Sequence, residues 1–419
     1  MLLAALLAVA VLLLLPGGLM LLARWSVRPF LSVAFWIASW WWLPRLGPGR
    51  GAFLKGALLA FALLGLARLL KPLRPRPLAA HPAGSLSLAK GLVWGGMALA
   101  LVAPLTASWL PPPEAALDGL TARLLVARDG IPETCEPLLP GREFGLVPQG
   151  LASLAADVGL VSDAPAWPAL RVAIGAAQAL LLLAGFHIAR RFVADVPAAL
   201  GAIVLALSVS ALGVLSAGAV LGAALALAAA PQVAGPARAP AVGAGVLLGA
   251  SALCGGLAAP VVALGIGLAS AMRRAGAGRG AALGRLGLAA ATASLVVLPS
   301  LLHVSVASLL PSGLVGARVR SLERAPDADE RAAMSWLESH TGPLDVVCAD
   351  APAALWIPAL AGRGVVVEGR FEPVPSGSER ALPARPCTLR YATGEQPEEG
   401  SVLFRSGAVT IAEIRNSRP

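Results

Sequence analysis

The first 113 residues of the chain contain no Asp or Glu, and from Pro165 to Leu322 the only one is Asp195. All the other carboxylates lie in two windows, Glu114–Asp163 and Glu323–Glu413. An ionised carboxylate is strongly unfavourable in hydrocarbon, so a chain keeps such groups where water reaches them. We therefore expect the two windows to be the aqueous parts of a membrane protein, and we expect any acid–base chemistry to occur there.

Charge of either sign is scarce as well. Charged residues make up 13% of the chain and hydrophobic residues 57%, and the mean hydropathy is +0.77. Soluble domains are roughly a quarter charged, so the composition predicts a polytopic membrane protein with a soluble part. The net charge of +10 does not indicate nucleic-acid binding, because the basic residues stand at the ends of apolar runs without a basic–aromatic pattern.

Cysteine and histidine are too few and too dispersed to indicate a metal centre. None of the four cysteines has CxxC spacing, and the four histidines are far apart in sequence. Cys348 and Cys387 fall on candidate strands of the second acidic window. In an oxidising compartment they would form a disulfide, and the alternative is a pair of buried free thiols.

Ten apolar runs have about the length and composition of membrane-spanning helices. The stretches 196–230 and 239–272 are each read as a tight hairpin, with Gly255 and Gly256 permitting the second turn. The predicted spans are Leu2–Leu22, Pro29–Leu46, Ala52–Leu70, Leu92–Trp109, Leu170–Ala189, Val196–Leu212, Leu215–Ala230, Ala239–Cys254, Leu257–Met272 and Gly284–Leu302.

Basic residues predict the orientation. Arg68–Lys90, Arg190–Arg191 and Arg273–Arg285 are rich in Lys or Arg and are expected to face the cytoplasm. With ten spans, both acidic windows then face outward. The sequence thus predicts a multi-pass plasma (inner) membrane protein with a transmembrane domain at residues 1–315, which includes an extracytoplasmic loop at 110–168. Residues 316–419 would form a small extracytoplasmic α/β domain.

The tail alternates between helical and strand patterns. Helices are expected at Asp327–Ser339 and Ala353–Leu360, the first because acidic residues follow Pro326 at its start. Strands are expected at Leu344–Cys348, Gly364–Glu368, Cys387–Tyr391, Ser401–Phe404 and Val409–Ile414, with a hairpin turn between the last two.

The first acidic window contains the candidate chemistry. Asp118 follows the Trp-Leu-Pro-Pro-Pro end of a predicted span, and the leucines after it have helical spacing, so we expect a short amphipathic helix lying on the bilayer. An acid at this height is suited to deprotonate a hydroxyl acceptor while Arg123 or Arg128 binds the phosphate of a lipid-linked donor. The alternatives are that Asp118 caps the helix and that the arginines bind lipid headgroups.

The layout resembles the GT-C class of integral-membrane glycosyltransferases, including the dolichyl- and polyprenyl-phosphate-sugar enzymes and their bacterial members. The resemblance runs from about Leu92 to the C-terminus and rests on loose motifs. In the loop these are Asp118, Gly130-Ile131-Pro132 and Val147-Pro148-Gln149-Gly150; in the tail they are Asp329-Glu330, Ser335-Trp336-Leu337, Asp345-Val346-Val347 and Trp356-Ile357-Pro358 through Arg363.

The resemblance implies transfer of a sugar from a polyprenyl-phosphate donor to an extracytoplasmic glycan, lipid or protein acceptor, with Asp118 as the catalytic base. Arg123, Arg128, Gln149, Trp356 and Arg363 are then the candidate substrate-binding residues, although Trp356 also reads as core and Arg363 as a loop charge. No metal ligands are assigned, and a divalent cation stays open as a cofactor. Membrane lipids are expected partners and nucleic acid is not.

The sequence also departs from the family pattern. The loop acid is single, and the His that often follows it in bacterial members is missing, with Ala122 and Ala152 at the plausible positions. A degenerate member without catalysis, acting as a non-catalytic membrane scaffold, is therefore one alternative. A transporter of lipid-linked glycans is another, although no internal repeat is evident.

Overall fold

The computed structural model describes most of the chain, which is largely helical with a small C-terminal sheet. The described residues are 1–17, 27–42, 49–69, 85–106, 115–132, 134–139, 150–212, 216–233, 238–275, 279–299, 325–350, 356–368, 387–394 and 401–414.

Each of the ten apolar runs contains a helix within this described part. Their bounds are α1 (Leu2–Leu14), α2 (Arg28–Trp42), α3 (Arg50–Leu69), α4 (Ser85–Val102), α7 (Ala166–Ala189), α8 (Asp195–Leu212), α9 (Ala217–Val233), α10 (Arg238–Gly255), α11 (Ala258–Ala275) and α12 (Arg279–Val297). Both long stretches are divided into separate helices, and the second breaks at Gly256, whose φ of 79° is in the left-handed region that glycine tolerates. Helices α10 and α11 of the second stretch pack against each other, as a hairpin requires. In the first stretch α8 packs on α4 and α7, whereas α9 packs on α7 and α10, so that hairpin is not confirmed.

Two helical segments in the described residues are long and apolar enough to cross a membrane by length and composition alone. They are Leu88–Leu105 and Ala166–Ala189. Their surroundings differ, since 67% of the second segment is buried but only 17% of the first. Seven further apolar helices are shorter.

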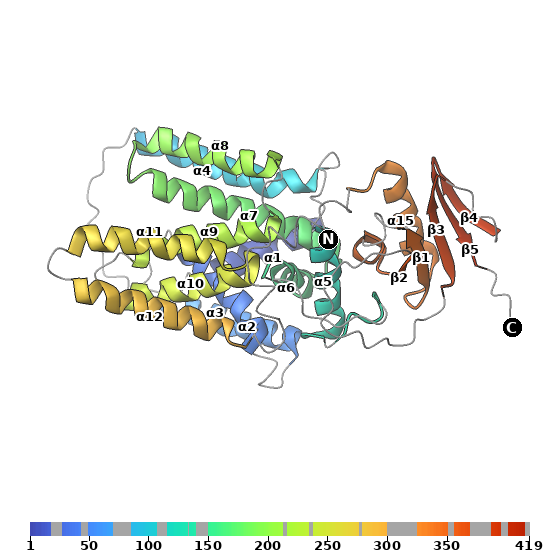
Figure 1. Ribbon diagram of the computed structural model, residues 1–419, viewed down its shortest axis with the longest axis horizontal. Helices are drawn as coiled ribbons and strands as arrows, with labels where there is room; N and C mark the ends of the chain where they lie inside the picture. Colours follow the sequence, from blue (N-terminus) through green and yellow to red (C-terminus); the bar gives the residue numbers. More distant parts are fainter. Residues whose placement is uncertain are drawn as a thin grey trace. The chain divides into compact units, whose positions relative to one another are not determined.

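The chain divides into two compact units. The first unit comprises Met1–Trp109 and Val147–Pro311, and its long helices run side by side (Figure 1). Helix α10 packs against α9, α11, α12 and α2. Small residues permit this approach: a side chain at Gly245 or Gly249 would collide with Thr292 or Val296 of α12. A thirteen-residue helix, α6 (Gly150–Ser162), packs against α1, α2, α3 and α7 of the same unit.

The second unit comprises Leu110–Leu146 and Ser312–Pro419. Its described strands are β1 (Val346–Asp350), β2 (Gly364–Glu368), β3 (Leu389–Thr393), β4 (Ser401–Ser406) and β5 (Val409–Glu413). They form one sheet in the order β2-β1-β3-β5-β4. Strand β1 pairs in parallel with β2 and β3, whereas β5 pairs antiparallel with β3 and β4. The predicted strands are confirmed with small shifts in their ends.

Helix α15 (Ala328–His340) confirms the first tail helix and packs against β4 and β5. Its start is fixed by a capping box, in which the Asp327 carboxylate accepts from the Glu330 amide and the Glu330 carboxylate accepts from the Asp327 amide. The second tail helix is present as the single turn η7 (Ile357–Ala361), and residues 351–355 of that prediction lie outside the described part.

Residues 110–146 belong by contact to the unit that contains the tail, whereas the sequence grouped them with the apolar runs. Two interactions illustrate this. The Val365 amide of β2 donates to the Leu138 carbonyl at 3.0 Å, so the segment 134–139 covers that edge of the sheet. Helix α5 (Ala115–Arg128) packs on η7. A disulfide joins Cys348 of β1 to Cys387, which decides between the two alternatives left open for these cysteines.

Candidate functional site

Asp118 lies in the first turn of α5 and is half-buried. The helix forms where the leucine spacing predicted it, but Leu120, Leu124 and Leu125 are each at most 2% exposed. The apolar stripe is therefore buried inside the protein rather than presented to a bilayer, because α5 packs on η7. The positive end of the helix dipole stabilises an ionised carboxylate at this position. Asp118 is thus placed to accept a proton from a group that approaches its exposed side.

Arg123 is one and a half turns further along α5 and connects that helix to the tail. Its Nη2 donates to the carbonyls of Leu360 at 2.9 Å and Ala359 at 3.4 Å, and it forms an ion pair with Glu338 at 3.9 Å. Burial lowers the pKa of the Arg123 guanidinium, while the Glu338 carboxylate raises this pKa. The guanidinium therefore holds α5 against η7, and its capacity to bind an added phosphate is largely taken up.

Arg363 has a similar role within the tail. Its Nε donates to the Thr341 hydroxyl at 2.7 Å, and its Nη2 donates at 2.7 Å to the carbonyls of both Glu338 and Thr341. Its Nη1 donates to the Ala361 carbonyl at 3.2 Å. The side chain is buried and joins the end of α15 to η7. Trp356 is fully buried at 0% exposure, directly before η7.

The other two predicted binding residues have different positions. Arg128 is exposed at the last turn of α5, where its Nη2 donates weakly to the Glu136 carbonyl at 3.5 Å. Gln149 lies outside the described residues. All the predicted site residues that the structure describes therefore belong to the second unit. Within it Asp118 and Arg128 have exposed surface, and Arg123, Arg363 and Trp356 serve packing.

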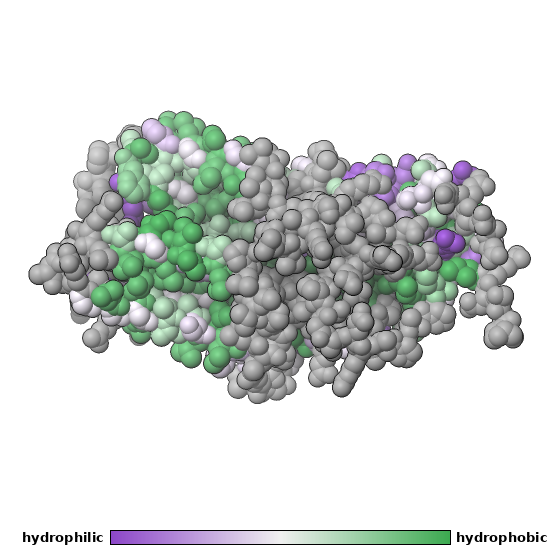
Figure 2. Space-filling view, viewed as in Figure 1, coloured by the Kyte–Doolittle hydropathy of each residue, from purple (hydrophilic) through white to green (hydrophobic). Residues whose placement is uncertain are grey.

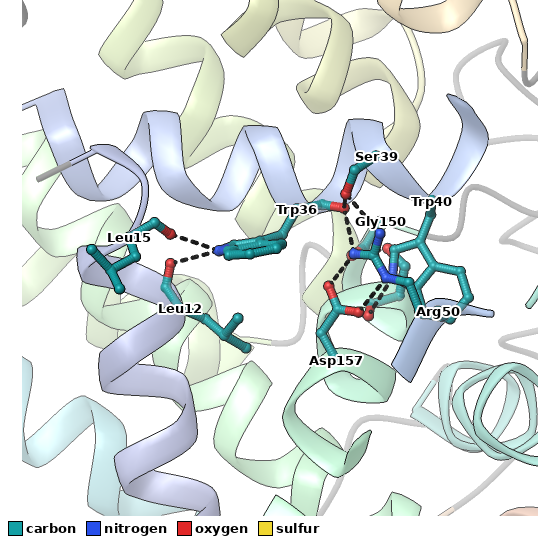
Figure 3. Close-up of polar contacts among 9 residues, drawn as sticks. Leu12, Leu15, Trp36, Ser39, Trp40, Arg50, Gly150 and Asp157 are labelled. Atoms are coloured by element: carbon teal, nitrogen blue, oxygen red, sulfur yellow. Dashed lines mark hydrogen bonds and ion pairs between the residues drawn. The ribbon is translucent and has the colours of Figure 1, made fainter. Parts of the chain in front are cut away.

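An additional polar cluster, which the sequence did not predict, is buried in the first unit (Figure 3). Arg50 at the start of α3 donates from Nε to Asp157 Oδ1 at 2.8 Å and from Nη2 to Asp157 Oδ2 at 2.6 Å. Its remaining donors reach the Ser39 hydroxyl at 2.7 Å and the Trp36 carbonyl at 3.0 Å. Both charged side chains are at most 2% exposed. The Arg50 guanidinium also stacks over the Trp40 ring at 4.6 Å.

This cluster joins α2, α3 and α6, and its members satisfy one another. At the end of α2, Trp40 and Trp41 are 2% and 4% exposed, so they pack inside the protein, whereas Trp42 is 43% exposed. The signal that could have indicated the pair is Asp157 itself. It is the single charged residue in the otherwise apolar α6 sequence, and a carboxylate buried on such a helix needs a cationic partner.

Among the residues that the structure describes, no three His, Cys, Asp or Glu side chains gather closely enough to hold a metal ion.

The comparisons with known proteins found no match among family models, curated proteins or solved structures.

Proposed function

We propose that the first unit is embedded in a membrane. The supporting observation is the apolar exterior of its helices, visible as hydrophobic side chains on the face in Figure 2. Large apolar residues are more than half exposed on five different helices: Leu63 on α3 (57%), Trp94 on α4 (69%), Val204 on α8 (62%), Val261 on α11 (61%) and Leu295 on α12 (58%). A bundle that is apolar both inside and outside is typical of a protein whose solvent is lipid.

The proposed topology places Asp118 and the tail outside and the α7–α8 turn inside. Cysteine probes at Ser335 and Ala194 test it, because both positions are exposed and the native free cysteines Cys135 and Cys254 are buried. In intact cells an impermeant maleimide is expected to modify Ser335→Cys and to spare Ala194→Cys until the membrane is opened. If the maleimide modifies Ala194→Cys and spares Ser335→Cys in intact cells, the orientation is the opposite of the one proposed.

We further propose that the protein is a glycosyltransferase of the GT-C type that uses a polyprenyl-phosphate sugar. Two features support this. Asp118 combines partial exposure with a helix position that favours its ionised form, as a base requires. Its carboxylate also follows a predicted span closely in sequence, where a hydroxyl acceptor and a lipid-borne donor can meet. The sequence resemblance is the reason for choosing sugar transfer over other reactions of a hydroxyl nucleophile.

In this proposal the acceptor hydroxyl loses its proton to Asp118 as its oxygen attacks the anomeric carbon of the donor. The bond from that carbon to the polyprenyl-phosphate oxygen breaks, and the lipid phosphate leaves with the electron pair. Arg128 is the candidate to bind this phosphate, because its guanidinium is exposed. Arg123 acts instead as a positioning residue that fixes α5 and therefore Asp118.

The experiment compares Asp118→Asn with Asp129→Asn in membranes supplied with a polyprenyl-phosphate sugar. Loss of a general base is expected to reduce transfer by about 10²-fold or more. Asp129 is a matched control on the same segment: it is exposed, and its φ of 49° is one that asparagine also tolerates. Equal activity of the wild type and Asp118→Asn would exclude Asp118 as the base.

A non-catalytic membrane scaffold is the second candidate. It is favoured by the use of Arg123, Arg363 and Trp356 in packing, which leaves few exposed groups for a substrate. Absence of transfer by the wild type with every polyprenyl-phosphate sugar tried, together with normal membrane insertion, would support this function.

A further inference from the structure

We propose that the turn between α7 and α8 binds the headgroup of an anionic phospholipid. The proposal rests on the membrane embedding proposed above and adds the lipid class and the residues that select it. The turn consists of residues 190–194, all of which are exposed. It contains two arginines, a phenylalanine and a valine, a combination of cationic and apolar side chains that suits a membrane surface.

The turn presents its apolar side chains outward. Phe192 is 82% exposed and Val193 is 50% exposed. The backbone is nevertheless held in one conformation, because the Phe192 and Val193 amides both donate to the Ala189 carbonyl and the Arg190 amide donates to the Phe186 carbonyl. The exposure of Phe192 is therefore built into the fold and does not arise from a loose segment. An aromatic ring in such a position fits the boundary between headgroups and acyl chains.

Positive charge dominates the turn. Arg190 and Arg191 follow the C-terminal end of α7, where the helix dipole favours cations. Arg190 forms an ion pair with Asp195, whose Oδ1 lies 3.8 Å from Arg190 Nε, with both side chains partly exposed. Two arginines against one carboxylate leave a net positive surface, which complements a phosphatidylglycerol-type headgroup and has no net attraction for a zwitterionic one.

An apolar stripe continues from the turn along α8. Leu200, Val204 and Leu207 follow helical spacing and are each at least half exposed, at 50%, 62% and 53%. A lipid with its phosphate at the two arginines can lay its acyl chains against this stripe, and Phe192 lies between the arginines and α8 in sequence. The surface therefore has both parts that a bound phospholipid requires.

The test uses the purified full chain in uncharged detergent, titrated with short-chain phosphatidylglycerol or phosphatidylcholine and followed by its melting temperature. Phosphatidylglycerol is expected to raise the melting temperature at lower concentration. Each arginine near an anionic surface is worth about fivefold in affinity, so Arg190→Gln with Arg191→Gln should weaken phosphatidylglycerol binding by about 25-fold and remove the preference. Phe192→Ser should weaken binding of both lipids and keep the preference.

The matched control is Arg331→Gln with Arg405→Gln, which removes the same two charges from exposed positions of the other unit. It should leave the lipid preference unchanged. Retained preference in the turn variant, an equal effect of the control, or equal binding of the two lipids would overturn the proposal. Release of the wild type from membranes by alkaline carbonate would instead overturn membrane embedding, and this proposal with it.

Discussion

Neutralising Asp157 is expected to destabilise the first unit more than removing any other single charge on its described helices, except that of its partner Arg50. The substitution Asp157→Asn keeps the shape of the side chain but leaves the Arg50 guanidinium buried at 3% exposure without its counter-charge. The two carboxylate oxygens of Asp157 accept hydrogen bonds from Arg50 at 2.8 and 2.6 Å, and the asparagine amide can accept only one of them. Breaking a buried pair from one side typically costs about 3–5 kcal/mol.

At about 2 °C per kcal/mol for a unit of this size, that cost corresponds to a fall of roughly 6–10 °C in melting temperature. The full chain in detergent can be followed by tryptophan fluorescence, because Trp36 and Trp40 both contact Arg50. Asp195→Asn is the matched control. It makes the same chemical change in a partly exposed pair at 3.8 Å, which is worth about 0–1 kcal/mol.

A double variant isolates the pair. Arg50→Met with Asp157→Asn removes the stranded charge, so it should be about as stable as either single variant, giving a coupling of about 3 kcal/mol. If Asp157→Asn melts within 1–2 °C of the wild type, or if the two single effects simply add, the buried ion pair does not hold α2, α3 and α6 together as argued.

Two further predictions concern the second unit. Replacing Cys348 and Cys387 with alanine removes a cross-link between residues 39 positions apart and should cost about 2–4 kcal/mol, seen as a lower melting temperature that reductant does not lower further. Gly362→Ala should cost more than Gly394→Ala, although both glycines have positive φ, at 67° and 84°. A Cβ at Gly362 would collide with the Arg123 guanidinium, whereas a Cβ at Gly394 has no atom within 4 Å, so equal losses of stability would show that Arg123 is not held as described.

The positions of the long helices could be predicted from the sequence because each one is an apolar run that is separated from the next by glycine, proline or basic residues. The tail was equally readable, since Asp327 and Glu330 have the spacing of a capping box and alternating apolar residues mark its strands. Such signals are local, and local signals are what a single sequence contains. The packing of α5 depends on η7, which is more than 200 residues away in sequence. The sequence therefore predicted a helix lying on the bilayer, whereas its leucines are covered by protein.

The candidate site was only partly predictable for the same reason. Residue type alone does not distinguish an arginine that binds a ligand from one that joins two elements: Arg123 and Arg128 are five residues apart on one helix, yet one is held by tail carbonyls and the other is exposed. Arg50 and Asp157 are separated by 107 positions, so no spacing pattern could pair them. Asp157 lies in the same acidic window as Asp118, but it is buried against Arg50 and its neutralisation is expected to damage the fold, so it is unsuitable as a control for Asp118.

Burial also ranks the carboxylates of the first acidic window as candidate bases. Asp157 is paired with Arg50, and Asp129 and Asp163 are exposed rather than held in a site. Among the described carboxylates of the window, this leaves Asp118 and Glu136, both half-buried. Asp118 is the better candidate because the N-terminal end of α5 stabilises its ionised form, and because Arg123 fixes the helix that presents it. A general base must be ionised before it accepts a proton, and it must be held in position relative to the substrate. The helix N-terminus supplies the first requirement, and the contact of Arg123 with η7 supplies the second.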